Sequence, residues 1–156
     1  MDGFHPDFDA NVTAPFDACG VDERRKRVHH IRASELDADT AQTDGLQRFA
    51  AISGKSVGAQ QLWMGETYIE PDTASGNHHH GESETAIYVR SGHPEFVFHD
   101  GVQEVRIKTE PGDYIFVPPF VPHREENPDP ATPAEVVIAR NSQEAIVVNL
   151  PELYPL

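Results

Sequence analysis

Apolar and polar residues alternate along most of the chain after residue 45. Eight short segments mix β-branched or aromatic residues with polar ones, at 46–53, 59–70, 86–91, 94–99, 102–108, 113–118, 135–140 and 145–150. This alternation is typical of strands with one buried face, and Gly, Pro, Asp and Asn separate the segments. Helical periodicity is almost absent, with one weak helical turn expected at 33–38. The pattern therefore predicts an all-β, closed or sandwiched antiparallel fold.

The chain divides into two parts of different composition. Residues 1–26 are rich in Asp, Pro and small residues, with three phenylalanines spaced among them, which predicts an irregular N-terminal arm. The phenylalanines are expected to anchor this arm to the domain or to a second subunit. Residues 27–156 are predicted to form one domain, because 156 residues provide one ordinary core and not two.

Charge and cysteine content exclude several classes of function. The chain has 12 Lys and Arg against 26 Asp and Glu, a formal net charge of −14, which repels phosphate backbones and argues against nucleic-acid binding. No segment approaches the roughly 20 consecutive apolar residues of a membrane helix, so we expect no membrane partner. The N-terminus lacks the pattern of a secretory signal, and Cys19 has no second cysteine to pair with. We therefore expect a cytoplasmic protein.

Three histidines and two glutamates, all potential metal ligands, lie close together in GNHHHGESE, residues 76–84. In an extended segment alternate side chains share a face, so His78 and His80 point the same way and His79 points the opposite way. Two imidazoles on one face can hold a single metal ion, and a turn after His80 returns Glu84 to the same side. His123 follows a proline-rich loop that fixes its backbone, which makes it a candidate for the fourth ligand.

These two segments resemble the two signature motifs of the cupin superfamily. The first motif has two histidines separated by one residue, then a glutamate and a glycine, which here are His78, His80, Glu84 and Gly92. The second motif matches Gly112, Pro118, His123 and Asn127. The resemblance covers about residues 45–150 and implies a single cupin-type, jelly-roll-like antiparallel β-barrel in which His78, His80, Glu84 and His123 bind one metal ion.

Three positions depart from the cupin motifs. Asp72 and Phe120 stand where the motifs have glycine. Seven residues separate Glu84 from Gly92 where the motif has six, so we expect a bulge or a shifted turn, with Glu82 as the alternative carboxylate.

Three imidazoles and one carboxylate suit Fe, Mn, Ni, Cu, Co or Zn and do not select among them. The resemblance implies a small-molecule enzyme, and we favour a dioxygenase acting on a small enol, diketone or aromatic, with Glu84 accepting a proton. The alternatives are a non-redox isomerase, lyase or polyketide cyclase, and a non-catalytic binding protein. The resemblance also implies a homodimer. Aromatic residues available to line the pocket are Trp63, Phe116 and Phe120, and the polar strand residues to check for the cavity are Tyr88 and Arg140.

Overall fold

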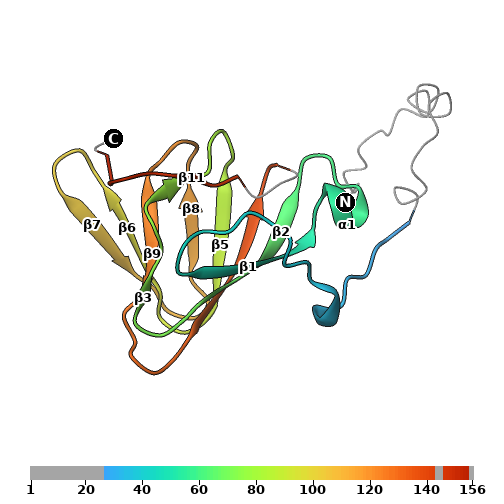
Figure 1. Ribbon diagram of the computed structural model, residues 1–156, viewed down its shortest axis with the longest axis horizontal. Helices are drawn as coiled ribbons and strands as arrows, with labels where there is room; N and C mark the ends of the chain where they lie inside the picture. Colours follow the sequence, from blue (N-terminus) through green and yellow to red (C-terminus); the bar gives the residue numbers. More distant parts are fainter. Residues whose placement is uncertain (1–26, 143–145, 155–156) are drawn as a thin grey trace, which may run out of the picture.

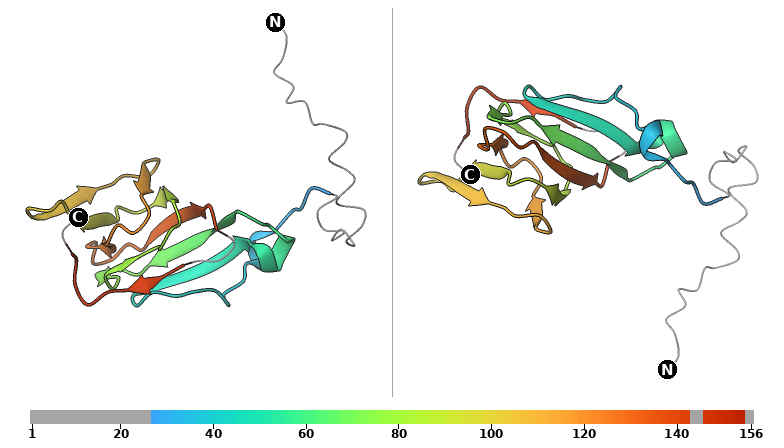
Figure 2. Two further views of the ribbon diagram at one scale, coloured as in Figure 1. Left: turned by 90° about the horizontal axis from the view of Figure 1, so that it is seen from above. Right: turned by 90° about the horizontal axis from the view of Figure 1, so that it is seen from below.

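Two antiparallel β-sheets face each other in a computed structural model that describes residues 27–142 and 146–154 (Figures 1 and 2). The arm predicted at 1–26 lies outside these residues. The first sheet has the order β1 (Leu46–Ile52), β2 (Trp63–Ile69), β10 (Ala134–Arg140), β5 (Thr85–Ser91) and β8 (Tyr114–Val117). The second has the order β11 (Val148–Asn149), β4 (His78–His79), β9 (His123–Asn127), β6 (Glu95–His99) and β7 (Glu104–Lys108), and β3 (Thr73–Ala74) pairs with β9. The predicted all-β, jelly-roll-like barrel is confirmed.

Helices are short in the described part of the chain. The turn expected at 33–38 is a 3-10 helix at Ala33–Glu35, and α1 (Gly54–Val57) follows β1. Ser53 caps α1, because its hydroxyl accepts a hydrogen bond from the backbone N–H of Ser56. None of the described helices has the length and apolar content needed to cross a membrane.

The inner faces of the two sheets form the core. Along β2, β5 and β10 every second residue is buried, as the alternation in the sequence predicts. The main core cluster consists of Ala50, Trp63, Ile87, Val89, Phe96, Val117, Val136 and Ile138. Towards β4 and β9 the buried side chains become polar, and these residues form the site described below.

Two residues in tight turns adopt a left-handed backbone conformation without being glycine. Asp72 has φ of 49° and Phe120 has φ of 61°. Both stand where the cupin motifs have glycine, so the turns keep the shape that glycine accommodates most easily. Gly92 keeps its motif position with φ of 75°, where a Cβ atom would come within 2.7 Å of the Cα of Ala134. All three of these motif positions therefore have positive φ angles.

Candidate metal centre

The three predicted histidines meet inside the barrel. His78 on β4 pairs directly with His123 on β9, and His80 follows β4 by one residue. The three ring centroids are 4.5 to 4.9 Å apart, and all three side chains are buried. His79 lies on the other side, where its Nδ1 accepts the Gly81 N–H and its ring is 5.9 Å from that of Phe120. The alternation expected along this segment is therefore present.

Backbone carbonyls determine which nitrogen of each ring faces its neighbours. His78 Nδ1 is 2.9 Å from the carbonyl oxygen of Gly76, and His80 Nδ1 is 2.9 Å from that of Ile146. His123 Nδ1 is 3.0 Å from the carbonyl oxygen of Val121. A carbonyl only accepts hydrogen bonds, so Nδ1 carries the proton in each ring and Nε2 presents a lone pair. The Nε2 atoms of His78 and His123 are buried and have no hydrogen-bond partner.

The carboxylate in this group belongs to Glu125, two residues after His123 on the same face of β9. Its Oε2 lies 3.6 Å from His78 Nε2, and its Oε1 lies 3.8 Å from His123 Nε2. Ser75 holds it in place, because the Ser75 hydroxyl donates to Oε2 at 3.2 Å and accepts the backbone N–H of Glu125 at 2.9 Å. One ligand atom from each of His78, His80, His123 and Glu125 fits within 4.8 Å of all the others.

Burial favours the neutral form of His123 and His80, which is the form that binds metals. Loss of solvent lowers the pKa of His123 to about 4. Burial also lowers the pKa of His80 far below its usual range, with a further contribution from the positive charge of Arg140. Burial alone would raise the pKa of Glu125, but His78, His123, Arg48 and the Ser75 hydrogen bond lower it overall. Three Nε2 atoms, of which those of His78 and His123 have no hydrogen-bond partner, therefore converge with one carboxylate, a set that fits a divalent transition metal.

Glu84, the carboxylate predicted from the sequence, lies outside this group, and the structure brings Glu125 to the three histidines in its place. Glu84 is exposed, and its backbone N–H and its carboxylate contact the side-chain amide of Asn141 at 2.9 and 3.5 Å. The alternative, Glu82, is exposed as well. The inward position is taken by Thr85, which is 0% exposed.

The seven residues between Glu84 and Gly92 are explained if Thr85, and not Glu84, occupies the glutamate position of the motif. Six residues separate Thr85 from Gly92, as in the cupin motif, so a threonine stands at the motif's glutamate position. A register shift between β5 and β10 does occur opposite Glu135 and Val136, but it lies far along the strand from Glu84. Sequence reasoning missed Glu125 because β9 has the sequence HREEN, without β-branched residues. The alternation of side chains along a strand, counted from His123, was the signal that could have identified Glu125.

Sheet β1-β2-β10-β5-β8 contributes a buried guanidinium opposite the histidines. Arg140, at the end of β10, is 2% exposed, and its Nη2 is 3.4 Å from His80 Nε2. Its guanidinium carbon lies 5.4 Å from the centroid of the Trp63 ring. Burial, then the charge of Arg48, lowers the pKa of Arg140 to about 9, so it remains a cation at neutral pH. Arg140 thus faces the interior, whereas Tyr88 packs on Tyr114 at 5.1 Å and is partly exposed.

An apolar pocket adjoins the histidine group. It has a volume of 270 Å³ and is lined by residues of β6, β7 and β8, by the loop after β8 and by His123. Phe96, Phe98 and Phe116 give it an aromatic wall, and Phe116 is 60% exposed at its mouth. Of the three aromatic residues expected to line the pocket, Phe116 does so, whereas Trp63 lies in the core and Phe120 lies beside His79. The pocket can therefore hold the apolar part of a small molecule beside the site.

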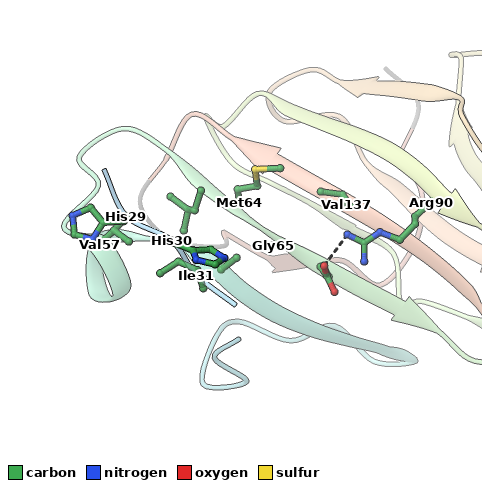
Figure 3. Close-up of a pocket in the computed structure, with 11 residues that line it drawn as sticks. His29, His30, Ile31, Val57, Met64, Gly65, Arg90 and Val137 are labelled. Carbon is green, nitrogen blue, oxygen red and sulfur yellow. Dashed lines mark hydrogen bonds and ion pairs between the residues drawn. The ribbon is translucent and has the colours of Figure 1, made fainter. Parts of the chain in front are cut away.

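A second pocket lies on the other face of the first sheet (Figure 3). It has a volume of 420 Å³, and its walls include His30, Met64 and Val137. Arg90 lines one side of it and pairs with Glu66 at 2.7 Å. Because these charges neutralise each other, we assign no chemistry to this pocket.

The motif residue Asn127 is structural. Its side-chain amide donates to the carbonyl oxygens of Ile69, Glu70 and Thr132, at 3.2, 3.2 and 2.8 Å. These bonds fasten the end of β9 to β2 and to the loop before β10. Asn127 therefore holds β9, and with it His123 and Glu125, in register.

Comparison with solved structures shows the fold in other proteins. The polyketide cyclase RemF from Streptomyces resistomycificus superimposes with a TM-score of 0.58 and 22% identity, over 80% of this chain and 84% of that one. An oxalate decarboxylase from Lactobacillus farciminis gives 0.61 and 19% identity over 72% of this chain, which spans 33% of the decarboxylase. A recombinant oxalate oxidase in complex with glycolate gives 0.62 and 17% identity, over 74% of this chain and 60% of the oxidase.

Comparison of the sequence with protein-family models identifies a cupin domain. No curated protein sequence matches the chain. A family model described as a cupin domain matches residues 65–140, from β2 to the end of β10. This segment contains all four residues of the buried group. The family match shows a cupin domain at residues 65–140, and the solved structures show the same fold.

Proposed function

We propose that this cupin is a metal-dependent enzyme that acts on a small molecule bound at His78, His80, His123 and Glu125. The observation that carries the proposal is the convergence of Nε2 lone pairs, two of them without any hydrogen-bond partner, on one buried carboxylate. A bound divalent transition metal would supply Lewis acidity and, if redox-active, one-electron chemistry with dioxygen. Four protein ligands leave positions open on an ion that prefers six, so substrate oxygens can bind there.

The residues of the chain have separate roles in this proposal. The three Nδ1–carbonyl hydrogen bonds fix the ring orientations and raise the basicity of the ligating nitrogens. Ser75 fixes Glu125, which is also the buried carboxylate available to accept a proton from an enol or a phenol. The aromatic wall around Phe96 and Phe116 keeps water away from the apolar part of the substrate.

For the reaction we propose first a dioxygenase acting on a small enol, diketone or aromatic. The three buried imidazoles and the aromatic pocket of 270 Å³ support this choice. The second candidate is a non-redox lyase, isomerase or cyclase, and a specific observation favours it. Arg140 places a fixed positive charge beside the site, where it would stabilise a negative oxygen without electron transfer. The solved structures that share the fold include a cyclase, a decarboxylase and an oxidase, so the fold accommodates both candidates.

The test is oxygen consumption by protein purified without an affinity tag and reloaded separately with Fe, Mn, Ni, Cu, Co or Zn. Small enols, diketones and catechols are offered in an oxygen electrode, with product analysis by mass spectrometry. Substrate-dependent oxygen uptake that is lost in Glu125→Gln and kept in Glu84→Gln supports the dioxygenase. Product formation without oxygen uptake supports the second candidate. Metal binding with no turnover of any substrate would leave a non-catalytic binding protein and refute the enzyme.

We also propose a homodimer. Three large apolar side chains on β8 and the following loop are exposed, namely Tyr114, Phe116 and Phe120, with 77%, 60% and 58% of their surface accessible. Light scattering of the full chain and of a chain lacking residues 1–26 tests this proposal. A monomeric full chain contradicts it, and an unchanged dimer after truncation would show that the arm is not needed.

A further inference from the structure

The barrel interior contains more positive than negative charge. Among the described residues, two guanidinium groups, Arg48 and Arg140, are buried at 1% and 2% exposure, and Glu125 is the one buried carboxylate. Among these arginine and glutamate side chains one positive charge has no counterpart, and a divalent metal would add two more. Buried charge is costly unless it is paired and hydrogen-bonded. The interior therefore favours an anion that is not part of the protein.

The two arginines differ in how many of their hydrogen-bond donors have a partner. Arg48 is tied into the loop before β1, where Nη1 donates to the carbonyl oxygen of Ala41 and Nη2 to the Thr43 hydroxyl. Arg140 has no such anchors. Its Nε and Nη1 are buried without a hydrogen-bond partner, and its Nη2 has only the 3.4 Å contact with His80. Nε and Nη1 each share an edge of the guanidinium with Nη2, and either edge is suited to a carboxylate, which it binds through two parallel hydrogen bonds.

Thr85 adds a donor beside Arg140. The two residues are direct partners in the pairing of β5 with β10, and both point into the barrel. The Thr85 hydroxyl is also buried without a hydrogen-bond partner. The position that holds glutamate in the cupin motif thus holds a neutral donor here. A glutamate at this position would neutralise Arg140, whereas threonine leaves the guanidinium available.

We propose that Arg140 and Thr85 bind the carboxylate of a ligand that also reaches the metal centre, so that the substrate of this site is a small carboxylate. Calling this ligand a substrate rests on the proposed function. Arg140 lies on the sheet opposite β9 and contacts His80, so a carboxylate on either edge lies beside the ligand group. The apolar pocket next to His123 would receive the remainder of the molecule.

The experiment measures acetate binding to the metal-free protein, so that it does not depend on metal loading. Trp63 is the single tryptophan of the chain and lies against Arg140, so its fluorescence reports on the site. Acetate is titrated at constant ionic strength, acetamide serves as the neutral analogue, and calorimetry provides a second readout independent of the tryptophan. We expect saturable binding of acetate and none of acetamide. Arg140→Met should weaken acetate binding at least tenfold, and the exposed control Arg32→Met should leave it unchanged.

Two milder variants keep the test decisive if Arg140→Met does not fold, which circular dichroism would show. Arg140→Lys keeps the charge but loses the two parallel hydrogen bonds, and Thr85→Val removes one hydroxyl at similar volume. Each should weaken acetate binding several-fold. Equal affinity in the wild type and these variants, equal binding of acetamide, or no acetate binding by the wild type would overturn the inference.

Metal analysis of the same samples separates this inference from the proposed function. Acetate binding by a protein that takes up no metal would preserve the anion site and refute the metal-dependent enzyme. Metal uptake without acetate binding, in either the metal-free or the loaded protein, would refute the anion site alone.

Discussion

Acidification should destabilise the metal-free protein, because burial favours the neutral form of His123 and His80 in the folded state. Burial lowers the pKa of His123 to about 4, whereas an unfolded histidine titrates near 6.5. Between these two values the unfolded chain binds more protons than the folded one, so the free energy of unfolding falls as the pH falls through this window. For His123 alone the loss is about 2 kcal/mol at pH 5 and approaches about 3.4 kcal/mol below pH 4. His80, whose pKa is also lowered by burial, adds to the loss in the same direction.

Urea unfolding at about pH 7.5 and pH 5, followed by Trp63 fluorescence, measures this loss. Measurements stop at pH 5 because protonation of carboxylates such as Glu125 contributes at lower pH. His123→Gln removes the titrating group, so its difference between the two pH values should be smaller than the wild-type difference by about 2 kcal/mol. His30→Gln, at an exposed histidine outside the group, is the control and should behave as the wild type. An unchanged difference in His123→Gln would refute the conclusion that His123 is buried as a neutral ligand.

Three further substitutions test the surroundings of the site. Ser75→Ala removes the hydroxyl that holds Glu125 and should lower metal affinity by about 10- to 100-fold in a chelator competition; unchanged affinity would contradict this role. Asp72→Gly relieves the left-handed backbone and should raise the free energy of unfolding by up to about 1 kcal/mol in urea, whereas a loss of stability would show that the aspartate side chain stabilises the turn. Thr85→Glu places a carboxylate beside Arg140 and should abolish acetate binding by the metal-free protein; retained binding would place the anion elsewhere.

The fold was predictable because most of its strands bury one face. Strands such as β5 and β10 alternate apolar and polar residues, and the predicted segments 86–91 and 135–140 coincide with them to within one residue. Strand β9 was not predicted, because its buried positions hold His123, Glu125 and Asn127. Tertiary pairing with β4 and β6, and not the propensity of its residues, makes this segment a strand.

Part of the site was also predictable from the alternation of side chains along a strand. The three histidines could be located because a strand period of two and the motif spacing agree. The carboxylate was misplaced because the length of the turn after His80 decides whether residue 84 or residue 85 points inward, and that length is not visible in the sequence. Arg140 was identified as a polar residue to check, but its lack of hydrogen-bond partners emerges only from the arrangement of the opposite sheet.

The most direct test of the central claim is the metal content of wild-type protein, Glu125→Gln and Glu84→Gln, each equilibrated with the same divalent metal, freed of excess and measured by mass spectrometry. We expect about one equivalent in the wild type and in Glu84→Gln, and a large loss in Glu125→Gln, as for a site with one carboxylate ligand. Loss in Glu84→Gln with retention in Glu125→Gln would show that the carboxylate ligand is the one predicted from the sequence. A wild type that binds no metal would contradict the metal centre altogether.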